Sequence, residues 1–420
     1  MSFARLLLLT AAPLALCTQA QAADPTAILD TYADIALAGY EDSLETAQQL
    51  DAAIEALIAD PTEASLTAAR EAWLTARVPY QQTEAYRFGN PIVDEWEGRV
   101  NAWPLDEGLI DYVDASYGTE SDTNQFYTVN IIANASVSAA GQTVDASEIT
   151  PELIQSLQEV GGIEANVATG YHAIEFLLWG QDLNGTDAGA GARPATDFDA
   201  ANCSNGNCDR RAAYLAAASD LLIADLEEMV ANWRADGAAR AALTEESPEA
   251  GLSAILTGLG SLSYGELAGE RMKLGLLLHD PEEEHDCFSD NTHNSHYYDV
   301  LGISNVYNGS YKRVDGSTVS GASLAEFVRE KDAAIADEIE ADIAATVEAA
   351  TALKARAEAG EAYDQMIGEG NEEGNAAVQA VIDGLVKQTR SLERVIAALD
   401  LGGVTIEGSD SLDNPDAVFQ

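Results

Sequence analysis

Apolar residues recur every three or four positions along most of the chain, which predicts amphipathic helices. Two Ser/Thr-Pro pairs, Thr150-Pro151 and Ser247-Pro248, each place a capping side chain before a proline at a first helical position. Strand-like alternation is confined to 124–144, where we expect a short hairpin or an irregular excursion. The pattern predicts helices over 26–59, from Thr62 to a break or kink at Pro79, from Pro151, over 215–233, from Pro248, over 323–358 and over 375–398.

These elements predict an all-α protein of two helical-bundle domains, because 420 residues exceed what one hydrophobic core usually supports. The stretch 182–207 is rich in Gly, Ala, Asp and Asn and lacks hydrophobic period, so we place the domains at 23–195 and 196–420. Segments 170–180 and 265–275 share Gly, Ala, Glu and Gly at equivalent positions. We interpret this as an internal duplication, with a chance match as the alternative.

The charge balance excludes two classes of binding partner. With 21 Lys and Arg against 71 Asp and Glu, the formal net charge is −50. Such a surface repels nucleic acid and anionic lipid headgroups, both of which require clustered basic residues. It also raises the local concentration of cations.

The N-terminus predicts export. Residues 1–22 combine Arg5, an apolar stretch and a small-residue site before Ala23, as secretory signals do. Lipid anchoring at Cys17 is a weaker alternative, because Leu16 is bulky where lipoprotein sites have a small residue. No later stretch is apolar enough for a membrane helix, so we expect a periplasmic or cell-envelope protein.

Three cysteines lie beyond this segment. In an oxidising compartment Cys203 and Cys208, five residues apart in a turn-rich loop, are the first pair to expect. A bond between Cys208 and Cys287 is the alternative, since sequence does not fix connectivity.

His172 and Glu175 are the strongest candidates for chemistry. Three residues apart on a helix, they lie on one face. Their neighbours are apolar, so the carboxylate is buried and needs a positive partner. That partner is a bound metal ion, an arginine such as Arg77 or Arg87, or the protonated form of His172 itself; the last two would make the pair structural.

A second polar cluster lies between 282 and 296 and contains most of the chain's few histidines. Histidine nitrogens mixed with carboxylates suit iron, manganese or zinc rather than calcium or magnesium. From this cluster we expect His285, Asp290 and His293 as additional metal ligands, with Glu270 from the preceding helix. A solvated turn in an acidic protein is the alternative.

The segment Gly170-Tyr-His-Ala-Ile-Glu-Phe-Leu-Leu-Trp-Gly180 resembles the GxHxxE signature of imelysin-like proteins, a family of secreted or periplasmic bacterial proteins. The run 284–293 is similar to the iron-regulated branch of that family. The resemblance implies two helical domains with the motif near their interface, and a role in iron handling outside the cytoplasm. Relatives were first described as peptidases, one of them cleaving insulin.

We therefore expect a metal-binding protein for iron, with zinc or another divalent cation as alternatives, that serves iron acquisition together with other envelope iron-uptake proteins. A metallopeptidase that uses His172 and Glu175 is the second hypothesis. Its catalytic residues are unknown: the HExxH signature is absent, and a general base must come from a residue such as Glu270 or Glu84. The third hypothesis is a non-catalytic interaction module.

Overall fold

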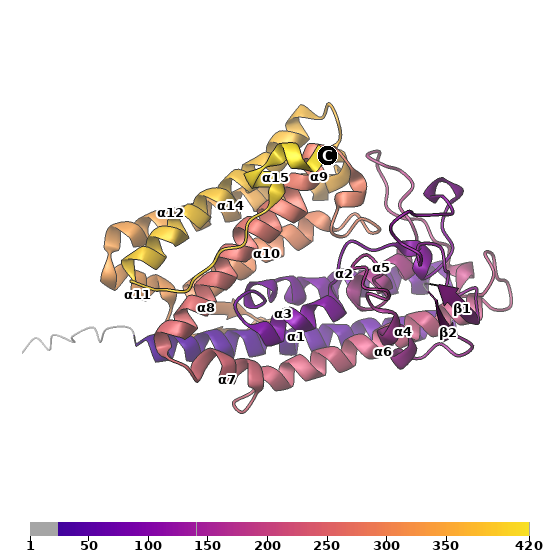
Figure 1. The fold of residues 1–420 in the computed structure, drawn as a ribbon, viewed down its shortest axis with the longest axis horizontal. Coiled ribbons are helices and arrows are strands. Elements are labelled where there is room, and N and C mark those ends of the chain that lie inside the picture. Colours follow the sequence, from indigo (N-terminus) through magenta and orange to yellow (C-terminus); the bar gives the residue numbers. More distant parts are fainter. Residues whose placement is uncertain (1–23, 140, 420) are drawn as a thin grey trace, which may run out of the picture.

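The computed structural model describes residues 24–139 and 141–419, so the expected signal segment 1–22 lies outside the described residues. The fold is all-α apart from two small hairpins, as expected (Figure 1). In the described part, each helix is too short or too polar to cross a membrane.

Most predicted helix starts are confirmed, because their caps are local interactions. Thr62, Thr150 and Ser247 each accept a hydrogen bond from a backbone N–H in the first turn of the following helix. The segment 323–358 is instead two helices, because Asp332 is extended and caps the second one. The helix that contains Pro79 ends at Gln81, close to the expected break.

One helical layer is built around α1 (Pro25–Ala59), whose apolar face is buried. α2 (Glu63–Gln81) and α6 (Cys208–Trp233) pack along α1, and α6 runs beside it in Figure 1. Shorter helices complete this layer: α3 (Pro91–Val100), α4 (Pro151–Leu157), α5 (Gly170–Trp179) and α7 (Ala238–Thr244). α6 follows the boundary expected at 195 yet packs with the N-terminal helices; the division into two domains stays a prediction.

The second layer carries the C-terminal half of the chain, with α12 (Ala333–Glu358) packed against α14 (Glu372–Ala398). α10 (Thr292–Asn308) packs against α2 on one side and α12 on the other, so it joins the two layers. Besides short 3-10 turns, the other helical elements of the described chain are α8 (Pro248–Ser261), a π-helical segment (Leu262–Lys273), α9 (Leu274–Leu278), α11 (Leu324–Lys331), α13 (Tyr363–Ile367) and α15 (Asp410–Asp413).

The strands form two separate antiparallel hairpins. β1 (Ser136–Ala139) pairs with β2 (Gln142–Asp145), within the region where the sequence predicts an excursion. β3 (Ser310–Lys312) pairs with β4 (Thr318–Ser320) and was not predicted, since three-residue strands carry too little periodicity to be recognised.

Candidate metal centre

Helix α5, which carries His172 and Glu175, is fixed from both sides. Its first residue, Gly170, has φ +77°, and a Cβ there would lie 2.3 Å from the carbonyl oxygen of Val100. Glycine is therefore required where α5 meets the end of α3. From α2, Trp73 donates its indole N–H to the carbonyl of Tyr171 at 2.9 Å. This packing buries every residue of the helix.

The loop before α10 brings the second half of the site to α5. The backbone N–H and hydroxyl of Ser289 both donate to one oxygen of Glu175, at 3.0 and 2.7 Å. The indole N–H of Trp103 donates to the carbonyl of Glu284 at 2.8 Å. These contacts place His285 and Asp286 beside His172, which precedes them by more than a hundred residues.

Three side chains converge closely enough to bind one metal ion. One donor atom from each of His172, His285 and Asp286 lies within 4.8 Å of the other two. Nδ1 of His172 also lies 3.0 Å from Glu175 Oε2 and 3.9 Å from Asp286 Oδ1. All four side chains are buried, and Nε2 of each histidine lacks a hydrogen-bond partner. Imidazole nitrogens with carboxylate oxygens suit a first-row transition metal.

The charges of the site leave one carboxylate without a cation. Arg77 forms a salt bridge with Asp286 at 2.9 Å and donates to Asn101 Oδ1 at 2.6 Å. Among the described residues, no arginine or lysine forms a salt bridge with Glu175. Of the two arginines considered from the sequence, Arg77 pairs with Asp286, and Arg87 pairs with other carboxylates. A metal ion would balance the remaining charge.

The pKa shifts of the buried groups agree that Glu175 lacks a positive partner. Burial, with a contribution from Arg77, lowers the pKa of His172 to about 3, so His172 is neutral and does not supply the positive charge. Burial and the nearby Asp286 raise the pKa of Glu175 well above its usual value. Burial also acts to raise the pKa of Asp286, but Arg77 and His285 hold it well below its usual range. Glu175 is therefore the group that most requires a cation to stay ionised.

A cleft of about 410 Å³ leads to the two histidines. His172 and His285 line it together with acidic residues: Asp106, Glu107, Glu282 and Glu283. Burial raises the pKa of Glu107 to about 7; a backbone hydrogen bond opposes this rise, and the nearby carboxylate of Glu282 adds to it. An acidic entrance of this kind concentrates cations.

The other predicted ligands lie outside this group. Glu270 is exposed and lines a neighbouring cleft that also reaches His285. His293 is half-buried, with Nε2 3.0 Å from the side-chain amide of Asn294. Asp290 lies near two other aspartates instead. Ligation by these three residues stays a prediction.

Asp286 was not among the ligands that we selected from the sequence. It stands next to His285, and its neighbours hold it in place: the amide of Asn291 donates to Oδ2 at 2.8 Å, and the hydroxyl of Ser295 also donates to Oδ2. Nothing in the local sequence distinguishes it from the surrounding acidic residues. Only its approach to His172 reveals it.

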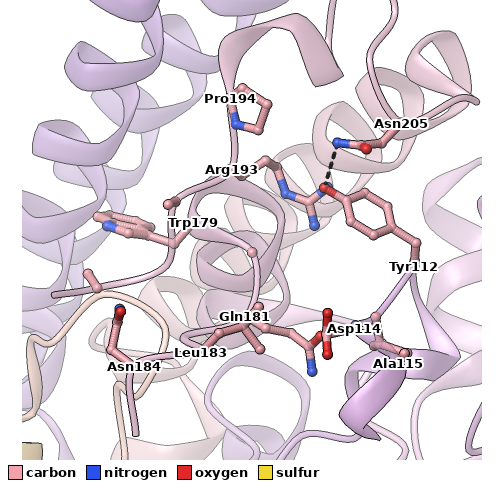
Figure 2. A pocket seen from close by; sticks show the side chains of 14 residues that line it. Tyr112, Asp114, Ala115, Trp179, Gln181, Leu183, Asn184, Arg193, Pro194 and Asn205 are labelled. Carbon is pink, nitrogen blue, oxygen red and sulfur yellow. Dashed lines mark hydrogen bonds between the residues drawn. The ribbon is translucent and has the colours of Figure 1, made fainter. Parts of the chain in front are cut away.

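A second cleft, of about 450 Å³, lies at the C-terminal end of α5 (Figure 2). Its lining includes Tyr112, Trp179 and Arg193. The guanidinium of Arg193 pairs with Asp111 at 2.8 Å and with Asp197 at 3.1 Å, so its charge is already balanced. This cleft contains neither of the groups of described residues that could hold a metal ion.

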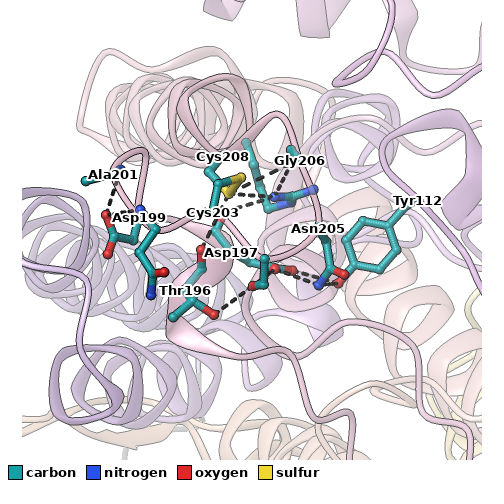
Figure 3. Close-up of a disulfide and its surroundings, with 12 residues drawn as sticks. Tyr112, Thr196, Asp197, Asp199, Ala201, Cys203, Asn205, Gly206 and Cys208 are labelled. Carbon is teal, nitrogen blue, oxygen red and sulfur yellow. Dashed lines mark hydrogen bonds between the residues drawn. A yellow bond between two sulfur atoms is a disulfide. The ribbon is translucent and has the colours of Figure 1, made fainter.

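The disulfide beside this cleft joins Cys203 and Cys208, which confirms the first of the two pairings expected (Figure 3). Cys287 is a free cysteine. Asp197 anchors the loop that contains the disulfide, because it accepts hydrogen bonds from Ser204 and Asn205, at 2.8 and 2.7 Å. The bond closes the loop that precedes α6, and its cysteines belong to neither group of described residues that could hold a metal ion.

Comparisons with known proteins agree with the resemblance of the motif. The sequence profile of the imelysin peptidase family matches residues 36–392. Iron-regulated protein A of Synechococcus elongatus is 34% identical over 95 residues, which are 22% of this chain and 27% of that protein. The chain thus matches only about a quarter of the length of this relative.

A similar fold occurs in the crystal structure of a protein described as an iron-regulated protein A precursor from Parabacteroides distasonis. The TM-score is 0.64 at 16% identity, over 92% of this chain and 98% of the other. At this identity the likeness concerns the fold alone.

Proposed function

This chain belongs to the imelysin family, and we propose that it is an exported protein that binds iron as its cargo at His172, Glu175, His285 and Asp286. The observation that carries the proposal is the convergence of two buried histidines with unpartnered ring nitrogens on two buried carboxylates, only one of which has an arginine. The names of the relatives, both iron-regulated protein A, support iron as the metal. The signal-like segment 1–22 supports a periplasmic or envelope location.

Binding of a metal ion requires fewer functional groups than hydrolysis of a peptide does. A metallopeptidase requires a base that activates water at an open metal position. Of the two bases considered from the sequence, Glu84 is held by Arg271 at 2.8 Å, and Glu270 is exposed in the neighbouring cleft. We therefore favour uptake of a metal ion, for delivery to other envelope proteins of iron acquisition, over peptide cleavage.

The test is a calorimetric titration of the metal-free protein with iron(II) under anaerobic conditions. We expect His172→Gln and Asp286→Asn to weaken iron(II) binding at least tenfold, about 1.4 kcal/mol or more, because each removes one donor of the group. Glu270→Gln and His293→Gln are matched controls that remove a carboxylate and an imidazole outside it, and should bind as the wild type does. Circular dichroism of each metal-free variant checks that it is folded.

Wild-type protein that takes up no iron(II), or four variants that all bind like the wild type, would refute the proposal. The interaction-module hypothesis predicts this result. The peptidase hypothesis predicts, in addition, chelator-sensitive cleavage of peptides that is lost in Glu175→Gln.

A further inference from the structure

A second group of carboxylates lies apart from the histidines. Asp182 follows α5, Asp290 lies in the loop before α10, and Asp364 lies at the start of α13. One oxygen from each of the three lies within 4.8 Å of the other two. Three segments that are distant in sequence thus bring their carboxylates to one point.

Two members of this group, Asp290 and Asp364, have side-chain oxygens without a partner, whereas Asp182 accepts hydrogen bonds from the backbone and the side-chain amide of Asn184 at 2.9 and 2.7 Å. Asp364 is 1% exposed, and neither of its side-chain oxygens has a hydrogen-bond partner. Oδ1 of Asp290 is also buried without a partner. Among the described residues, none of the three aspartates forms a salt bridge with a basic side chain. Uncompensated carboxylates so close together are unfavourable unless protons or a cation neutralise them.

A fourth buried carboxyl group, that of Glu284, interacts with the three aspartates. Glu284, which is 1% exposed, has one carboxylate oxygen without a partner. Burial and the other carboxylates raise the pKa of Asp290 to about 7, and burial raises that of Asp364 to about 6.

We propose that Asp182, Asp290 and Asp364 form a second cation site, which takes calcium and is distinct from the histidine centre. Oxygen donors without nitrogen or sulfur suit a hard cation. Calcium takes about six to eight oxygen ligands at about 2.4 Å in a flexible geometry, so it tolerates carboxylates that come from three separate segments. Magnesium, at about 2.1 Å, requires a tighter and more regular arrangement.

The position of the aspartate group predicts how calcium affects the stability of the chain. The loop 284–291 supplies His285 and Asp286 to the histidine centre and Asp290 to the aspartate group. Asp182 belongs to the N-terminal half and Asp364 to the C-terminal half. Calcium at this point therefore links the two halves and stabilises the folded chain, since it binds the native state alone.

Calcium binding to the chelator-treated full chain tests this, by calorimetry and by thermal unfolding with and without calcium chloride. We expect one calcium ion per chain and a higher midpoint of unfolding with calcium. Asp364→Asn and Asp290→Asn should each weaken binding at least tenfold and abolish the shift in midpoint. Both substitutions keep the shape and relieve repulsion, and asparagine tolerates the φ of +56° at Asp290.

Two controls separate this site from other acidic surfaces and from the histidine centre. Asp122→Asn removes an exposed carboxylate elsewhere and should bind calcium as the wild type does. His172→Gln should weaken iron(II) binding but leave calcium binding unchanged, so each site can fail independently of the other. Absence of calcium uptake by the wild type, or equal uptake by the Asp364 and Asp290 variants, overturns the proposal.

Discussion

Replacement of Arg77 by methionine tests how charge is balanced in the metal centre. Arg77 is 1% exposed, pairs with the fully buried Asp286 at 2.9 Å, and donates to Asn101 at 2.6 Å. Methionine keeps the apolar contacts of the stem but leaves Asp286 without its cation. Removing one partner of a buried ion pair costs about 3–5 kcal/mol.

For Arg77→Met the loss in free energy of unfolding should fall near the lower end of that range, because Asp286 keeps its hydrogen bonds from Asn291 and Ser295. We therefore expect Arg77→Met to lower the free energy of unfolding of the metal-free protein by about 3 kcal/mol. Bound metal replaces the lost positive charge and no longer meets repulsion from the guanidinium. The loss in free energy of unfolding should accordingly be smaller with bound metal than without it. Each 1.4 kcal/mol between these two losses corresponds to about tenfold tighter metal binding by the variant than by the wild type.

The assay is urea unfolding followed by circular dichroism, with chelator and with saturating iron(II) under anaerobic conditions. Arg77→Met/Asp286→Asn should recover most of the stability, since the double variant removes both charges of the ion pair. Arg87→Met is the control, because Arg87 pairs with carboxylates outside the metal centre. A loss below about 1 kcal/mol in Arg77→Met, or additive effects in the double variant, would refute the reasoning.

Two further predictions concern the entrance of the site and the disulfide. The pKa of Glu107 is about 7 in the folded chain, above its usual value of 4.5, so the wild type loses stability as the pH rises between these values. Near pH 4, Glu107→Gln should have the same free energy of unfolding as the wild type, and near pH 8 a value higher by up to about 3 kcal/mol. Urea unfolding at both pH values measures this. The same difference between variant and wild type at both pH values contradicts the prediction. Cys203→Ser opens the short loop closed by Cys208 and should lower the free energy of unfolding by about 2 kcal/mol, while iron(II) affinity stays unchanged; a loss of affinity would show that the loop supports the metal centre.

The sequence determined those features that depend on neighbouring residues. Helix starts at Thr62, Thr150 and Ser247 follow from caps that act within one turn. The all-α class follows from the helical period. The short loop made Cys203 with Cys208 the first pairing to expect, but the structure decided it against Cys208 with Cys287. His172 and Glu175 share a helix face for the same local reason.

Tertiary structure alone decided which distant groups meet. No periodicity indicates that Asp286 reaches His172, or that Asp290 joins Asp182 and Asp364 rather than the histidines. These contacts depend on how α10 and its preceding loop pack against α2 and α5, and that packing sums many weak interactions over the whole chain. The sequence thus identifies the kinds of candidate ligand, and the fold sorts them into a mixed histidine–carboxylate group and an all-oxygen group.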